Sequence, residues 1–103
     1  MLGNKIGTNI TGTAAIANSD AIIIQNSAHD VIGGYTAVER NLISGNTQYG
    51  VFLAGAGATE DTIKGNYIGT NFNGTSALGN GADGIGIEKE GRPPQLYRWY
   101  YIR

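Results

Sequence analysis

The sequence lacks cysteine, so it contains neither disulfide bonds nor cysteine-based metal sites. Only 15% of its 103 residues are charged and the formal net charge is -1, which leaves no basic footprint for nucleic acid and no acidic tail. No apolar run approaches the roughly 18 residues that a membrane-spanning helix needs. The first residues also lack the charged and apolar regions of a signal peptide. We therefore expect neither a nucleic-acid partner nor a membrane span.

Glycine, by contrast, is abundant at 17 residues, and the chain repeats itself. The segment GNKIGTN at residues 3–9 returns as GNYIGTN at residues 65–71, which lies 62 residues later. An acidic or amide residue before aliphatic residues also recurs in steps of 20 to 22 residues, at Asp20, Asn41, Asp61 and Asp83. Repetition at this period is typical of solenoids, in which each unit buries its apolar side against its neighbours. We interpret the long repeat as three short ones.

Apolar residues come in short bursts rich in Ile and Val, separated by Gly, Asn, Ser and Thr. They lack the spacing of an amphipathic helix, so they predict short strands broken by tight turns. An antiparallel sandwich or barrel is the alternative, but the regular step favours parallel coils of about 21 residues. In such coils equivalent side chains stack in ladders. The first candidates for an inward aliphatic ladder are Ile22, Ile43, Ile63 and Ile85.

Asparagine can form ladders as well, because each side-chain amide bonds to the next one in the stack. Asn46 and Asn66 share an Ile-x-Gly-Asn pattern and are the expected pair, with Asn4 as a remnant of the same position. The glycines beside them are expected to have a positive φ at the turn, namely Gly45, Gly65 and Gly3.

Composition changes sharply after Ile87. Both prolines, the only Trp and three of the six Tyr fall in residues 88–103. We expect residues 1–87 to form about four coils, and residues 88–103 to be a non-repeat tail that is either a cap or an out-of-frame end. Because proline cannot donate to a strand ladder, Pro93 and Pro94 should stop the coils. Open coil ends favour self-association, or stacking on the neighbouring coils of a longer parent chain.

The runs RNLISGNTQYGVFLAGAGATEDTIKGNYIGTN (40–71), GTSALGNGADGIGI (74–87) and DVIGG (30–34) resemble the right-handed parallel β-helix repeats of large bacterial surface and secreted proteins. This is the pectate-lyase-like and NosD-like β-helix superfamily, and the resemblance covers residues 3–87. It implies an all-β, right-handed parallel β-helix and an extracellular or cell-surface location. Because the fold hosts many activities, it does not choose a function.

Polysaccharide enzymes with this fold use clustered acids, so Asp61 and Asp83 are the best catalytic candidates if they stack in adjacent coils. The competing interpretation is a turn position where Asp and Asn are interchangeable, and Asn41 in the series favours it. His29 has no nucleophile beside it, and Arg40 conforms to the repeat, so both are expected to be turn residues. An enzyme is therefore the less favoured reading.

Tyr35, Tyr49 and Tyr67, with Phe72, are candidates for stacking against sugar rings in a groove. One incomplete copy of a calcium-binding nonapeptide, at residues 81–85, does not make a metal site, so we expect no metal and no cofactor. The expected function is a structural β-helix segment, with polysaccharide or cell-surface glycan as the candidate partner of an adhesive face. The alternative is a remnant of a polysaccharide lyase or glycoside hydrolase that acts on acidic polysaccharide.

Overall fold

The computed structural model describes residues 1–88 and the strand at 98–99. These residues form short β-strands and no helix, so none of them lies in a helix long and apolar enough to cross a membrane. The strands are β1 (Lys5–Ile6), β2 (Ile22–Gln25), β3 (Val31–Gly33), β4 (Leu42–Ile43), β5 (Val51–Ala54), β6 (Thr62–Lys64), β7 (Tyr67–Ile68), β8 (Ile85–Glu88) and β9 (Arg98–Trp99).

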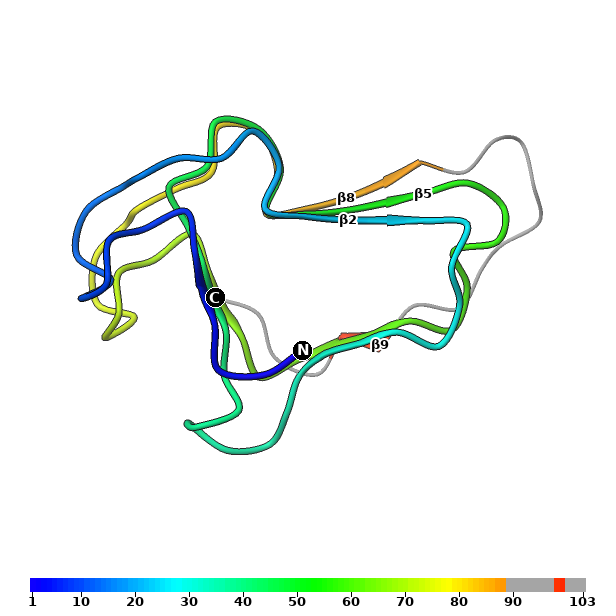
Figure 1. Ribbon diagram of the computed structural model, residues 1–103, viewed down its shortest axis with the longest axis horizontal. Coiled ribbons are helices and arrows are strands. Elements are labelled where there is room, and N and C mark those ends of the chain that lie inside the picture. The colour runs from blue at the N-terminus through cyan, green and yellow to red at the C-terminus, as the bar shows by residue number, and fades with distance from the viewer. Residues whose placement is uncertain (89–97, 100–103) are drawn as a thin grey trace.

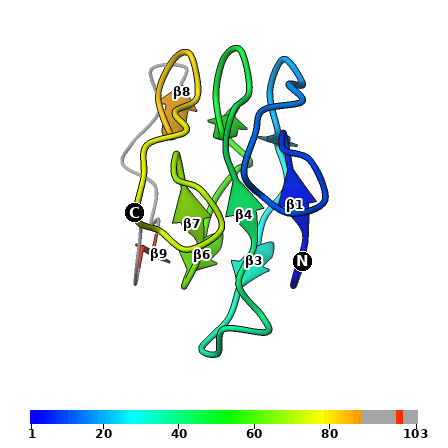
Figure 2. The same cartoon turned by 90° about the vertical axis from the view of Figure 1, so that its left-hand side faces the viewer.

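The strands build three sheets of three strands each, and every pairing is parallel. The first sheet has the order β1-β4-β7, the second β2-β5-β8 and the third β3-β6-β9. The chain thus visits the three sheets in the same order three times. We call each visit a layer: β1 to β3, β4 to β6, and β7 to β9. Figure 1 shows β2, β5 and β8 side by side, and Figure 2 shows the same for β1, β4 and β7.

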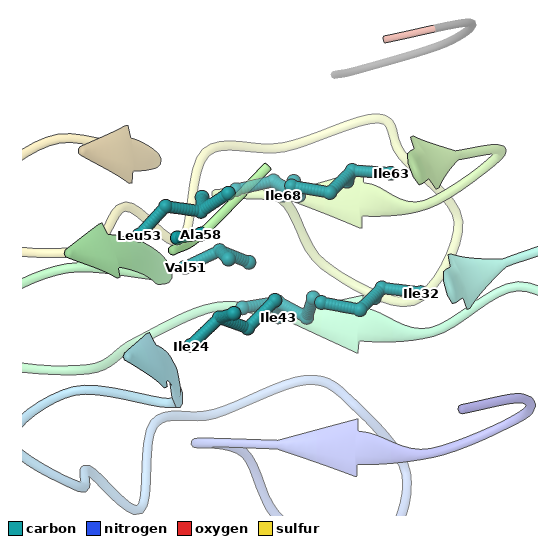
Figure 3. Packing of buried hydrophobic residues seen from close by; sticks show 8 residues of the cluster. All are labelled: Ile24, Ile32, Ile43, Val51, Leu53, Ala58, Ile63 and Ile68. Atoms are coloured by element: carbon teal, nitrogen blue, oxygen red, sulfur yellow. The ribbon is translucent and has the colours of Figure 1, made fainter. Parts of the chain in front are cut away.

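The core lies between the sheets and consists almost entirely of branched aliphatic side chains, which suit a pleated, buried surface. Each sheet contributes an inward row, such as Ile6, Ile43 and Ile68 in the first sheet. Figure 3 shows how these rows meet in the interior. The buried cluster consists of Ile24, Ile32, Ile43, Val51, Leu53, Ala58, Ile63 and Ile68.

The predicted parallel strands are confirmed, but the predicted coil length of about 21 residues is wrong. Equivalent asparagines are 37 residues apart between the first two layers and 25 residues apart between the next two, at Asn4, Asn41 and Asn66. The described strands also give three layers rather than four coils. The 20 to 22 residue step marks every second strand, whereas one layer contains three strands. The 62-residue repeat therefore spans two layers and relates β1 to β7.

The same error affects the predicted aliphatic ladder. Ile22 pairs with Val51, which pairs with Ile85, so these two isoleucines belong to the second sheet. Ile43 belongs to the first sheet and Ile63, opposite Ile32, to the third. Ile43 and Ile63 are fully buried, while Ile22 and Ile85 are partly buried against the same core. The four isoleucines therefore line one core from three sheets instead of forming one ladder.

Asparagine ladders exist, but their members differ from those predicted. One ladder precedes the first sheet and contains Asn4, Asn41 and Asn66. A second ladder follows this sheet and contains Asn46 and Asn80. Asn46 and Asn66 thus lie at opposite ends of the first sheet, because the Ile-x-Gly-Asn pattern occurs at two different corners of the chain path.

Close stacking of the layers requires glycine at particular corners. Gly3, Gly45 and Gly65 have positive φ angles of 67°, 73° and 67°, which confirms the prediction for these turns. Gly33 has a φ of 90°, and a Cβ there would collide with the carbonyl oxygen of Lys64 in the next layer. The glycine content is therefore partly a consequence of backbone contact between layers.

The predicted tail begins one residue inside β8, which extends to Glu88. Strand β9 lies within this tail and pairs in parallel with β6, so the tail contributes a strand to the third sheet. The two prolines lie outside the described residues, and so does the choice between a cap and an out-of-frame end.

Candidate functional site

The outer face of the first sheet carries an open pocket of about 350 Å³. Strand pairing places Lys5, Leu42 and Tyr67 in one outward row, because their neighbours Ile6, Ile43 and Ile68 point into the core. Leu42 forms an apolar floor and is only 4% exposed. The loops that flank the row in Figure 2 supply the walls, with Ala37, Val38 and Arg40 on one side and Phe72 and Asn73 on the other.

Two cations in this pocket lie over aromatic rings. The guanidinium carbon of Arg40 is 3.9 Å from the centre of the Tyr67 ring, and Nζ of Lys5 is 5.3 Å from the centre of the Phe72 ring. Such contacts are worth about 0.5–1 kcal/mol at exposed sites and hold the cation in place. The described residues that line the pocket include these two cations and no carboxylate. The site is therefore both aromatic and positively charged.

The two walls are fixed by hydrogen bonds. Glu39 accepts the backbone N–H groups of Tyr35 at 2.8 Å and of Thr36 at 3.1 Å, which closes the loop before Arg40. These two bonds, that from Tyr35 first, lower the pKa of the Glu39 carboxyl. In the opposite wall the Phe72 N–H donates to the Gly12 carbonyl at 2.8 Å, which joins the two copies of the repeated GTN loop. The repeat thus positions an aromatic side chain over the sheet.

The three predicted sugar-stacking tyrosines do not form one groove. Tyr67 lines the pocket, whereas Tyr35 is 83% exposed beyond it, with Nζ of Lys64 at 3.8 Å from its ring centre. Tyr49 lies next to the second sheet and stacks on Phe52 with ring centres 4.7 Å apart. Sequence reasoning proposed Phe72 correctly as a neighbour but missed the pairing of each aromatic ring with a cation. The alternation of Lys5 and Ile6 with Tyr67 and Ile68 in the two repeats carried that signal.

The predicted catalytic pair of Asp61 and Asp83 is wrong. Asp61 precedes β6 in the third sheet, whereas Asp83 precedes β8 in the second. Asp83 is exposed and its corner is shared with Asp20, whose Oδ1 accepts the Tyr49 N–H at 3.0 Å. The two acids belong to different sheets because the 20 to 22 residue step skips from one sheet to another.

Asp61 instead stacks on Asp30, which sequence reasoning did not consider as its partner. Asp61 is 1% exposed and its Oδ1 accepts the Asp30 backbone N–H at 2.9 Å. The Oδ2 atoms of both residues are buried without a hydrogen-bond partner among the described residues. The similarity of Asp30-Val31-Ile32 to Asp61-Thr62-Ile63 was the available signal.

Burial raises the pKa of Asp61, and the Asp30 side chain raises it further. The Asp30 N–H and the positive charge of His29 act in the opposite direction. His29 is an exposed turn residue with φ of 61°, and its Nδ1 lies 3.7 Å from Glu60 Oε2. No group of three or more His, Cys, Asp or Glu side chains among residues 1–88 could hold a metal ion.

No family model matches the chain, and neither the curated proteins nor the solved structures contain a significant match to it.

Proposed function

We propose that the chain is a structural segment of a right-handed parallel β-helix that presents a binding pocket for a negatively charged sugar on its first sheet. The solenoid part of this proposal is supported by the parallel pairing of all nine strands and by the asparagine ladders along the first sheet. From the resemblance alone, we also propose that the parent protein is a secreted or surface-exposed bacterial protein.

The sugar-binding part depends on one observation, namely that two aromatic rings and two cations line the same small pocket. Aromatic faces suit the apolar faces of sugar rings, and the side-chain amides of Asn4 and Asn73 provide hydrogen-bonding groups for hydroxyls. Lys5 and Arg40 favour a carboxylate or sulfate group on the sugar, because the described lining residues bring no negative charge to oppose it. The volume is near the lower end of the about 300–1,000 Å³ typical of small-molecule pockets, which suits one or two sugar units.

Titration calorimetry of the full chain with a uronic-acid oligosaccharide tests this function. We expect Tyr67→Ala and Phe72→Ala each to weaken binding by about tenfold, since buried aromatic anchors dominate such sites. Added salt should weaken binding as well, because screening reduces the attraction between the cations and an acidic sugar. Tyr49→Ala is the matched control, since it removes a tyrosine from another sheet and should leave affinity unchanged. Absence of binding to any acidic or neutral oligosaccharide at millimolar concentration would refute the proposal.

A further inference from the structure

The asparagine ladders show how a polar side chain connects one layer to the next. Asn66 Oδ1 accepts two hydrogen bonds from Asn41, one from its backbone N–H at 3.1 Å and one from Nδ2 at 3.0 Å. Asn41 Oδ1 accepts the same two bonds from Asn4, at 2.9 and 3.1 Å. Asn80 Oδ1 does so from Asn46, at 3.1 and 3.0 Å. We call this two-bond connection a rung.

Asp30 and Asp61 occupy an equivalent place before the third sheet, but their rung is half complete. The backbone bond is present, because Asp61 Oδ1 accepts the Asp30 N–H at 2.9 Å. The side-chain bond lacks its donor, since aspartate has an oxygen where asparagine has its NH₂ group. Both Oδ2 atoms are buried and have no hydrogen-bond partner among the described residues. A buried acceptor in this state is destabilising, and more so when it is charged.

We propose that Asp30 and Asp61 share one proton, which completes this rung and makes the attachment of the first layer to the second dependent on pH. With the proton present, one carboxyl O–H donates to the other carboxylate, as Nδ2 does in the asparagine rungs. Without it, two stacked carboxylates repel each other beside the core. The proton belongs to the pair rather than to either residue.

The surroundings favour the protonated pair. Burial, the Asp30 side chain and the Asp30 charge all raise the pKa of Asp61. The opposing cation, His29, is exposed and lies 3.7 Å from Glu60, so part of its charge is directed to that partner. The N-terminal ammonium of Met1 donates to the Val31 carbonyl at 2.8 Å, on the strand that follows Asp30. These groups flank the pair in β3 and β6 without supplying the missing hydrogen bond.

The direction of the pH effect follows from this raised pKa. The folded chain holds the proton more tightly than the unfolded chain, whose aspartates titrate near the ordinary value of about 3.9. The pair's contribution to stability is therefore fully present below that value and is lost as the pH rises through the raised pKa. Glu39 has a lowered pKa and acts in the opposite sense, so its contribution is lost as the pH falls. Variants are needed to separate the two.

Asp30→Asn is the decisive variant, because its Nδ2 would supply the missing donor to Asp61 Oδ1 without a proton. Urea unfolding of the full chain should show the variant about fivefold more stable in its unfolding equilibrium constant than the wild type near pH 7.5, the effect of one added hydrogen bond. Near pH 4 the two should be equal within error. Asp83→Asn is the matched control, since it removes the same charge from an exposed corner and should show no difference of this kind.

Carboxyl ¹³C NMR of the wild type provides a measurement that does not depend on any variant. We expect the Asp30 and Asp61 signals to titrate together and over two steps, one of them above the range of the exposed aspartates. Independent titration of both residues in the ordinary range would overturn the proposal. So would an Asp30→Asn variant whose stability advantage is the same at both pH values.

Discussion

The first and second layers contain equivalent strands but differ in how completely they are buried. In the second layer Ile43, Val51 and Leu53 are all 0% exposed, because a layer covers them on each side. In the first layer the equivalent positions are Ile6, Ile22 and Ile24, of which only Ile24 is classed with the buried core. Sequence position within the repeat therefore does not determine burial. What determines it is whether the structure continues on both sides.

This difference predicts the largest effect of a substitution in the core. Ile43→Ala should cost about 3–4 kcal/mol of unfolding free energy, because it leaves a cavity in a fully enclosed site. Ile6→Ala removes the same atoms one layer away, where the side chain is only partly buried, and should cost about 1 kcal/mol. Urea unfolding of both variants gives the comparison. Equal losses would show that the first layer is covered in solution as completely as the second.

The polar ladder provides a second and smaller contrast between the same layers. Asn41 is fully buried and bonds to Asn4 on one side and to Asn66 on the other. Asn41→Ala leaves the Asn4 amide N–H groups and the Asn66 carbonyl oxygen without these partners, and should cost about 2–3 kcal/mol. Asn4 is exposed, so Asn4→Ala should cost less than about 1 kcal/mol. Thermal unfolding of the two variants would contradict the contrast if Asn4→Ala were the more harmful change.

Much of the fold was predictable because the local signals are strong. Glycine-rich turns between short Ile and Val bursts indicate strands, and repetition indicates that these strands stack in parallel. The positive φ angles of Gly3, Gly45 and Gly65 follow from the same turn pattern. These features depend on residues that are near each other in the sequence.

Register was not predictable, because the loops between strands differ in length from layer to layer. The connection from β4 to β5 contains seven residues, whereas that from β1 to β2 contains fifteen. A search for one constant period therefore aligned Ile22 with Ile43, which lies in another sheet. The same error paired Asp61 with Asp83 instead of Asp30. Stacking across layers is a long-range property, so the candidate site was only partly accessible from the sequence, through Tyr67 and Phe72.

The smallest expected effect concerns the contact between the second and third layers. Ser44 is fully buried, and its Oγ accepts the backbone N–H groups of Gly69 at 3.1 Å and of Thr70 at 3.0 Å. Its equivalent in the first layer is Gly7, which has no side chain to make such a bond. Ser44→Ala should therefore cost about 1 kcal/mol, because the Gly69 N–H retains its bond to the Ile43 carbonyl at 3.0 Å. Hydrogen exchange should show faster exchange at Thr70 than at Gly69 in the variant. Unchanged exchange at Thr70 would mean that this amide finds another acceptor, and that Ser44 does not connect the two layers.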